Sequence, residues 1–368
     1  MKNACLILRK SKYLFSDNSY DAVMDAFISA GYAFDELRAC AVSDIEKINA
    51  TFFQLRVDYD NIMLFCDKSE LSTTKDAILN LFDGGVLQCS YNEAGIFDDK
   101  KTAVFLLSAD ESDTGVQYVK EVCVPYLAQK NTVKTDSFVI RCVGANYAHI
   151  EQLIIKAKQR GGNALSFVHI RKYGEDVIRI VYDMTISKML IDEIIRLFVD
   201  GLGECIYALE DISLQEQLVR LLKLRNRKIS VAESFTGGGI GRRIVSVSGA
   251  SKVYFEGLNT YNEDAKRKRL GVSEYTLKTS GVVSDQTAYE MAVGLIGTGD
   301  CDISIATTGL AGPKSDNSTL PIGLCYIAIG TIEKVFVYRY KFDGSRTEIT
   351  ETVINYALFL AYKQLKDI

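Results

Sequence analysis

Hydroxyl and glycine residues crowd one short stretch in the last third of the chain. After the apolar run that ends at Ala232 come Glu233, Ser234 and Thr236, followed by three glycines at 237–239. A serine hydroxyl can act as a nucleophile, and glycines let the main chain approach a ligand closely. If the turn opens a helix, its N–H groups and the helix dipole favour an anion or a developing oxyanion. The alternative is that Ser234 or Thr236 merely caps that helix.

Two other positions could join this stretch in one site. Thr308 and Gly309 form a second hydroxyl-and-glycine turn after an apolar strand, and Arg346 lies at the start of the last helix, behind the capping-box residue Ser345. Turns at the carboxyl ends of strands in an open α/β sheet converge on one crevice, where ligands bind. The alternatives are that Thr308 is a turn hydroxyl and Arg346 a surface residue of the capping box.

The remaining chemistry-bearing residues narrow the possibilities. Only His149 and His169 exist, so we do not expect a histidine-rich metal site, and a Ser-His-Asp triad would need one of these two. We place both on helix or strand surfaces, remote in sequence from the glycine turn. The basic run 266–269 reads as the solvated face of a short helix. A net charge of −4 with a pI near 5.5 provides no global positive field for nonspecific nucleic-acid binding.

Composition bounds the class of protein. At 368 residues, 48% apolar and 24% charged, the chain is long enough for two or three globular domains. No apolar span reaches membrane length and the start does not resemble a signal peptide, so we expect a cytoplasmic protein. The nine cysteines include no C-x-x-C pair, and Cys5, Cys66, Cys205 and Cys325 lie in apolar runs. They are interpreted as small buried residues in a reducing compartment.

The periodicity of apolar residues predicts the helices and strands that must position the site. The predicted fold class is α/β, with three domains at 1–132, 133–211 and 212–368. In the first domain, alternating strands and helices predict a parallel sheet covered by helices, with a structural or dimerising role. The second has the ferredoxin-like order β-α-β-β-α-β and is interpreted as a spacer or interface domain. The predicted strands are 4–8, 38–42, 62–66, 102–107, 138–143, 164–171, 177–182, 205–209, 227–232, 253–258, 302–307, 322–329 and 335–340. The predicted helices include 20–30, 44–55, 74–82, 114–129, 148–158 and 188–199.

Six short blocks in the third domain carry a resemblance. They are Ala232-Glu233-Ser234-x-Thr236-Gly237-Gly238, Tyr261…Ala265-Lys266…Leu270-Gly271-Val272, Gly281-Val282-Val283-Ser284, Thr308-Gly309-x-Ala311-Gly312-Pro313, Pro321-x-Gly323 and Gly344-x-Arg346. Their order resembles the C-terminal domain of the competence/damage-inducible protein A family, CinA. The two upstream domains also resemble that family's layout, a molybdopterin-biosynthesis-like α/β domain followed by a small α+β domain.

The resemblance implies an enzyme that hydrolyses the carboxamide of nicotinamide mononucleotide, releasing ammonia and leaving nicotinic acid mononucleotide. It implies Ser234 as nucleophile and Lys266 as its base, the latter with a pKa lowered by burial and nearby arginine. No cofactor or metal is implied, and we expect a homodimer that binds a small nucleotide, with no membrane or nucleic-acid partner. The further implied residues are Thr308 as a catalytic or positioning group and, for substrate binding, Thr236, Gly237, Gly238, Tyr261, Gly309 and Arg346, with N–H groups of 236–238 holding the oxyanion or the phosphate.

Departures from the family pattern keep a second function open. Phe235 stands where the family usually has cysteine, and its bulk is expected to reshape the pocket; residues 262–264 and the loop 314–318 also differ. The first domain lacks the family's Gly-Gly-Leu-Gly-Pro-Thr motif near 66–71, so we expect no ADP-ribose hydrolysis there. The alternative to an amidohydrolase is a non-catalytic nucleotide-binding or competence-linked interaction protein.

Overall fold

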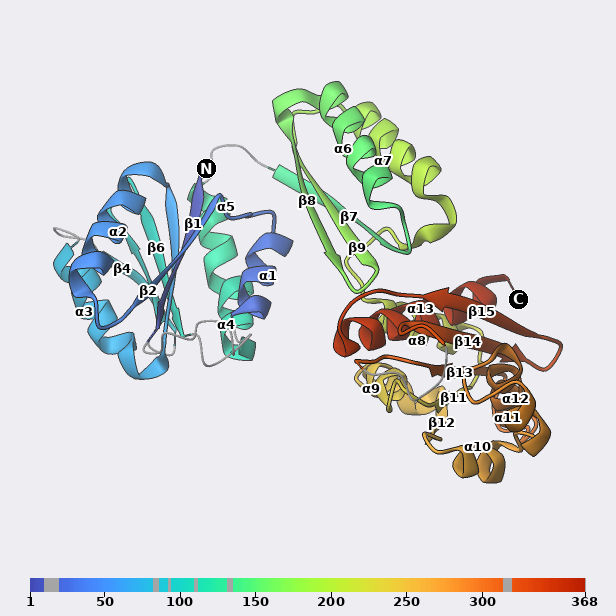
Figure 1. Cartoon of the computed structure of the whole chain (residues 1–368). Helices are drawn as coiled ribbons and strands as arrows, with labels where there is room; N and C mark the ends of the chain where they lie inside the picture. The colour runs from blue at the N-terminus through green and yellow to red at the C-terminus, as the bar shows by residue number, and fades with distance from the viewer. Residues whose placement is uncertain are drawn as a thin grey trace. The chain divides into compact units, whose positions relative to one another are not determined.

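The computed structural model describes residues 1–9, 20–81, 86–91, 94–108, 112–130, 135–313 and 320–367. It contains three β-sheets with helices packed on them, which confirms the predicted multi-domain α/β class (Figure 1). The chain divides into two compact units. One comprises Met1–Ser137, Ala164–Val168 and Val181–Ile186, and the other comprises Phe138–Asn163, His169–Ile180 and Ser187–Ile368. The three-domain division drawn from the sequence stays a prediction, and its first boundary falls outside the described residues.

The first sheet has six strands in the order β2-β1-β3-β6-β5-β4. The first four strands in this order run parallel, as predicted, whereas β5 and β4 form an antiparallel extension that the sequence did not predict. The strands are β1 (Asn3–Arg9), β2 (Glu36–Ala41), β3 (Asn61–Cys66), β4 (Val86–Tyr91), β5 (Ala94–Asp98) and β6 (Ala103–Ser108). The helices are α1 (Asp21–Ser29), α2 (Ile45–Asp58), α3 (Leu71–Leu81), α4 (Ser112–Tyr118) and α5 (Val124–Lys130), and a π-helical segment, Val119–Cys123, joins the last two.

Alternate residues of these strands face opposite layers of helices. Met63 and Phe65 of β3 pack in the cluster that contains Phe27 of α1, while Leu64 packs in the cluster that contains Phe52 of α2. Because side chains alternate along a strand, a strand that is apolar at every position can be buried on both faces. The apolar run of β3 therefore specifies a central strand covered by helices on both sides.

The second sheet has the order β10-β7-β9-β8, which is the ferredoxin-like arrangement predicted from the sequence. Its strands are β7 (Thr135–Val143), β8 (Leu165–Lys172), β9 (Glu175–Asp183) and β10 (Ile206–Ala208), with helices α6 (Tyr147–Gly161) and α7 (Lys188–Leu202). The side chain of His169 is only 7% exposed, bonded to Asp176 (2.8 Å) and Glu151 (3.1 Å). The expectation of a surface histidine was wrong here, because neighbouring carboxylates satisfy the ring nitrogens.

The third sheet has the order β12-β11-β13-β14-β15 and positions the residues implicated above. Strands β12, β11 and β13 are parallel, and β14 and β15 extend the sheet in antiparallel fashion. The strands are β11 (Ile229–Glu233), β12 (Tyr254–Asn259), β13 (Ile303–Gly309), β14 (Leu324–Thr331) and β15 (Val335–Lys341). The helices are α8 (Leu214–Leu224), α9 (Gly239–Val245), α10 (Glu263–Leu270), α11 (Glu274–Thr279), α12 (Asp285–Ile296) and α13 (Arg346–Asp367).

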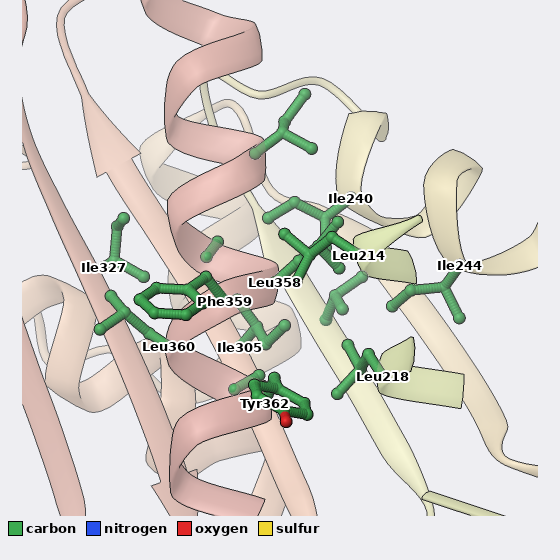
Figure 2. Packing of buried hydrophobic residues seen from close by; sticks show 14 of the residues in the cluster. Leu214, Leu218, Ile240, Ile244, Ile305, Ile327, Leu358, Phe359, Leu360 and Tyr362 are labelled. Carbon is green, nitrogen blue, oxygen red and sulfur yellow. The ribbon is translucent and has the colours of Figure 1, made fainter. Parts of the chain in front are cut away.

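The largest core lies between this sheet and the helices α8, α9 and α13. Side chains from α13, such as Leu358, lie among Leu218 of α8, Ile244 of α9 and the strand residues Ile305 and Ile327 (Figure 2). Each fully buried aliphatic side chain of this kind contributes about 1.5–3 kcal/mol relative to an exposed one. A smaller cluster that includes Met291 and Leu295 of α12 packs on the other face of the sheet. The two faces of the parallel strands are thus covered, so a functional site can form only at the ends of the strands.

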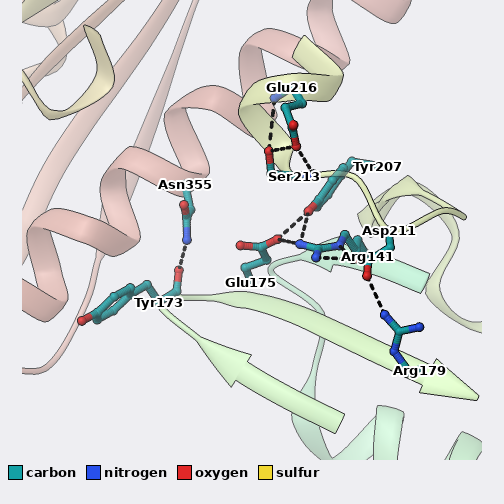
Figure 3. A network of polar contacts seen from close by, with 9 residues as sticks. All are labelled: Arg141, Tyr173, Glu175, Arg179, Tyr207, Asp211, Ser213, Glu216 and Asn355. Carbon is teal, nitrogen blue, oxygen red and sulfur yellow. Dashed lines mark hydrogen bonds and ion pairs between the residues drawn. The ribbon is translucent and has the colours of Figure 1, made fainter. Parts of the chain in front are cut away.

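A polar network follows the second sheet and leads into α8 (Figure 3). Arg141 pairs with Glu175 (3.2 Å) and Asp211 (2.6 Å), and the hydroxyl of Tyr207 donates to Glu175 (2.5 Å). Ser213 and Glu216 then form a capping box at the start of α8. The long helix α13 joins the same region, since the Asn355 amide donates to the carbonyl of Tyr173 at 3.0 Å.

The other fold-level predictions have mixed outcomes. Cys5, Cys66 and Cys325 are buried as expected, whereas Cys205 is only partly buried. Among the described helices, none is both long and apolar enough to cross a lipid bilayer.

Candidate active site

Three parallel strands of the third sheet end at the same edge, beside a surface cleft of about 360 Å³. Ser234 follows β11, Thr260 and Tyr261 follow β12, and Thr308 and Gly309 end β13. The cleft is lined by Ser234, Phe235, Tyr261, Asn262, Glu263, Val282, Val283, Thr308, Gly309, Leu310, Ala311, Gly312 and Arg346. The convergence of these turns was predicted, and the volume lies within the usual range of small-molecule sites, about 300–1,000 Å³.

Ser234 and Lys266 meet at this edge. The Nζ atom of Lys266 lies 2.9 Å from the Oγ atom of Ser234, although the residues are 32 positions apart in the sequence. The same Nζ donates to the carbonyls of Thr260 at 2.5 Å and Tyr261 at 3.4 Å. These carbonyls hold the amine against the hydroxyl, so the pair has the geometry that proton transfer from a nucleophile to a base requires.

Burial changes the acidity of Lys266. Its side chain lies on α10 and is 0% exposed. Loss of hydration lowers the pKa of Lys266 from 10.5 to about 8, and the carboxylate of Glu263 opposes part of this shift. Nearby arginine, which the sequence reading invoked, is not among the causes; Arg267 is exposed and pairs with Asp264. The prediction of a solvated basic face is therefore right for 267–269 and wrong for Lys266, which turns inward.

The glycine turn leads into a helix, as expected from the sequence. Helix α9 begins at Gly239, and its N-cap residue is Gly238, which has no side chain with which to cap. Neither Ser234 nor Thr236 caps this helix. Gly237 and Gly238 adopt φ angles of 61° and 92°, which glycine tolerates and other residues rarely adopt. These two glycines shape the turn that carries Ser234 away from the helix.

The N–H groups of the turn are mostly occupied. The N–H of Gly237 donates to the carbonyl of Ser234 at 3.1 Å, and the N–H of Gly238 donates to the carboxylate of Glu233 at 3.0 Å. The prediction that these two N–H groups hold an oxyanion or a phosphate is therefore wrong, because protein acceptors already use them. Across the described part of the chain, the N–H groups of Phe235 and Thr236 donate to no protein acceptor.

Glu233 is a site residue for which the sequence predicts no role. Its side chain is 1% exposed, and its carboxylate also accepts from the N–H groups of Ile240 (3.1 Å) and Gly241 (2.9 Å). The only sequence signal was a carboxylate at the end of an apolar strand, directly before the candidate nucleophile.

The hydroxyl of Thr308, which lines the cleft, is used by the protein itself. Its hydroxyl donates to the carbonyl of Val282 at 2.7 Å, and its side chain is fully buried. Thr308 thus ties the loop of Val282 and Val283, which forms one wall of the cleft, to the end of β13. The neighbouring Thr307 shares a 2.8 Å hydrogen bond with the hydroxyl of Thr236, which fixes the nucleophile turn to the same strand.

Phe235 and Gly309 fit against one another. Phe235 is 6% exposed and belongs to the core, although it also lines the cleft. A Cβ atom on Gly309 would lie 2.8 Å from the Phe235 ring and 2.7 Å from the Cβ of Cys325. Glycine at 309 therefore makes room for the ring, so the bulky residue is accommodated mainly in the core. The other departure, the loop 314–318, lies outside the described residues.

Arg346 and Tyr261 stand at the open side of the cleft. Arg346 is the first residue of α13, and the predicted capping box is present, with the Ser345 N–H 2.7 Å from Glu348. The guanidinium donates to the carbonyl of Gly312 at 2.8 Å, and its other N–H groups meet no described protein acceptor. The side chain of Tyr261 is 65% exposed. A larger hollow, about 570 Å³, lies at the opposite ends of the same strands, but no predicted site residue lines it.

Comparison with known proteins identifies the family that the last third of the chain resembles. Residues 211–365 match the family model described as the CinA C-terminal domain. The C-terminal domain is a CinA domain. A protein from Caldicellulosiruptor saccharolyticus, provisionally named as competence-damage inducible, is 36% identical over 249 residues, which cover 67% of this chain and 60% of that protein. The chain thus spans about 60% of the length of this curated relative.

Solved structures give similar matches to parts of the chain. The competence/damage inducible protein CihA from Agrobacterium tumefaciens is 34% identical, with 42% of this chain and 97% of that chain covered and a TM-score of 0.39. A molybdopterin biosynthesis protein from Mycobacterium abscessus is 11% identical, with 35% of this chain and 95% of that chain covered and a TM-score of 0.29. The resemblance to the CinA family that the motifs indicated is thus confirmed by the family model and the curated relative.

Proposed function

We propose that the CinA domain hydrolyses the carboxamide of nicotinamide mononucleotide to nicotinic acid mononucleotide and ammonia. The observation that carries the proposal is the 2.9 Å contact between the Ser234 hydroxyl and a buried amine, Lys266. With a pKa of about 8, roughly a tenth of the lysine is neutral at pH 7 and able to accept a proton. A serine next to such an amine has the two groups that amide hydrolysis needs, a nucleophile and a base.

In the first half of the reaction, the Ser234 oxygen attacks the carboxamide carbon while its proton passes to the neutral Lys266 amine. The N–H groups of Phe235 and Thr236 are proposed as donors to the oxyanion, because they follow the nucleophile and are not used by protein acceptors. As the intermediate collapses, the carbon–nitrogen bond breaks. The lysine ammonium returns the proton to the leaving nitrogen, which departs as ammonia and leaves an acyl ester on Ser234.

In the second half, water attacks the ester and gives a proton to Lys266. The ester bond to Ser234 breaks, and the serine oxygen regains a proton from the ammonium. The product is released as the carboxylic acid, which loses its remaining proton to the solvent and becomes the carboxylate. Lysine thus serves as base and acid in turn, and no histidine is required.

Substrate recognition is assigned to the walls of the cleft. Arg346 is proposed to bind the phosphate, since a guanidinium forms directed hydrogen bonds with phosphate oxygens. Val282 and Val283 provide an apolar wall for the pyridine ring, and Tyr261 provides an exposed aromatic side chain near it. Thr308 supports this wall through the Val282 carbonyl and is proposed as a positioning residue.

The test is ammonia release from nicotinamide mononucleotide by the wild type and by Ser234→Ala. Loss of the nucleophile is expected to reduce kcat by about 10³-fold or more. Ser246→Ala is the matched control, because this hydroxyl lies just after α9, is not among the residues that line the cleft, and donates to the carbonyl of Arg243. Equal rates for Ser234→Ala and wild type would reject the proposal. Tight calorimetric binding of the nucleotide without turnover would instead support a non-catalytic nucleotide-binding protein.

A further inference from the structure

The residue before the candidate nucleophile carries a buried carboxylate with an unusual set of partners. Both oxygens of Glu233 accept backbone N–H groups from the start of α9: one oxygen takes Gly238 (3.0 Å) and Ile240 (3.1 Å), and the other takes Gly241 (2.9 Å). Among the described residues, no cation forms an ion pair with Glu233. Its negative charge is therefore stabilised by hydrogen bonds from the main chain and by the positive end of the helix.

This arrangement satisfies the first turn of α9 from within the chain. The first N–H groups of a helix have no acceptor inside the helix. Here Glu233 takes two of them, Ile240 and Gly241, and the N–H of Gly239 donates to the carbonyl of Thr236 at 3.0 Å. The position at which a bound anion would ordinarily sit is thus filled by the protein's own carboxylate.

Glu233 also forms hydrogen bonds on both sides of the turn that carries Ser234. Its main chain is fixed on the strand side, where its carbonyl accepts the N–H of Thr260 at 2.8 Å, and the N–H of Ser234 donates to the carbonyl of Thr307 at 3.2 Å. Its side chain reaches over the turn to the helix that follows. The five-residue turn between strand and helix is thereby closed at both ends, with Ser234 inside it.

The geometry points to Glu233 as a positioning residue that holds the Ser234 hydroxyl against Lys266. This inference rests on the proposed function, in which Ser234 is the nucleophile. The carboxylate fixes the turn, and the turn sets the 2.9 Å contact. Glu233 is not among the causes that shift the pKa of Lys266, so its effect is geometric and not a change in the proton affinity of the base.

Glu233→Gln is the decisive variant. The amide keeps the shape but replaces one oxygen with an NH₂ group, which would face a backbone N–H donor. A displacement of a reacting group by about 1 Å can cost about 10²-fold in rate. We expect kcat to fall by about 10- to 100-fold with KM within about 2-fold of wild type, and the pH midpoint of activity to stay in place, because the base is untouched.

A second readout does not depend on the nucleotide. Labelling of Ser234 by a fluorophosphonate reports the reactivity of the hydroxyl directly, and its rate should fall by the same factor in Glu233→Gln. The matched control is Glu290→Gln, which removes another carboxylate that accepts a backbone N–H, from Ser273 at 2.8 Å, at the start of α11. Glu290→Gln is expected to lower the midpoint of urea unfolding but to keep kcat and labelling. If Glu233→Gln does not fold, Glu233→Asp takes its place. This variant keeps the negative charge but shortens the side chain by one methylene group. The same loss of kcat is expected.

The outcomes separate the two proposals. Wild-type kcat and labelling in the Glu233 variants would overturn the inference, as would losses in the Glu233 and Glu290 variants that merely follow the fraction of unfolded protein. If Ser234 is labelled but no ammonia is released, the proposed substrate fails while the labelling rates still decide the role of Glu233. If the wild type shows neither labelling nor ammonia release, both proposals fail.

Discussion

Replacing Lys266 with methionine should remove the titration of the lysine amine from two independent measurements, the pH dependence of the unfolding free energy and the pH dependence of kcat/KM. Burial lowers the pKa of Lys266 from 10.5 to about 8, a shift that corresponds to about 3 kcal/mol. Below about pH 8 the amine is protonated in the folded and unfolded states, so the folded state bears this full penalty. Between about pH 8 and 10.5 the folded protein loses the proton first, and its stability rises as the penalty disappears.

The assay is urea unfolding of wild type and Lys266→Met at several pH values. The unfolding free energy of the wild type should rise relative to that of the variant by about 1 kcal/mol between pH 7 and 9, and by about 2 to 3 kcal/mol between pH 7 and 10. Methionine leaves the carbonyl of Thr260 without its partner, but that cost does not depend on pH and cancels from the trend.

The same titration should control catalysis. Since only the neutral amine accepts a proton, kcat/KM of the wild type should rise about tenfold between pH 7 and 9, and Lys266→Met should lose about 10² to 10⁴ in rate at every pH. A stability difference that stays flat with pH, together with a rate that still rises, would show that another group titrates and would refute the assignment of the base.

Three further changes probe the walls of the site. Glu263→Gln should move the midpoint of the pH–rate profile below that of the wild type, because the Glu263 carboxylate raises the pKa of Lys266; an unchanged midpoint would contradict this. Arg346→Ala should raise KM for nicotinamide mononucleotide but not for the riboside that lacks the phosphate, a difference that steady-state kinetics with both compounds measures. Gly309→Ala should lower the unfolding free energy by about 1–3 kcal/mol, because the new methyl group would lie 2.8 Å from the Phe235 ring; a wild-type urea midpoint would argue against that contact.

Local patterns explain why much of the fold was predictable. The capping boxes at Ser213 and Ser345 are short-range signals and both are present. The apolar run of β3 and the ferredoxin-like order also followed from periodicity. The approach of Ser234 to Lys266 was expected because their motifs are those of the CinA family, whereas periodicity alone would have left Lys266 in a solvated basic run.

The details that escaped prediction depend on partners distant in the chain or on the main chain. Nothing in the sequence around His169 shows that Asp176 and Glu151 would enclose it. The role of Glu233 depends on three backbone N–H groups. Nearly every residue has such a group, so the residue types do not show which ones a side chain will bind. The group that satisfies the first turn of α9 was missed for the same reason, since it is the side chain of Glu233, which precedes the turn.

Helix α13 connects the cleft to the turn that contains Tyr173. Its 22 residues form a rod of about 33 Å, with Arg346 at the cleft end and Asn355 bonded to the Tyr173 turn further along. Lys363, near the far end, pairs with Glu204 at 2.6 Å. Because a helix resists compression along its axis, α13 is a stiff link between the Tyr173 turn and Arg346, the residue proposed to bind the phosphate.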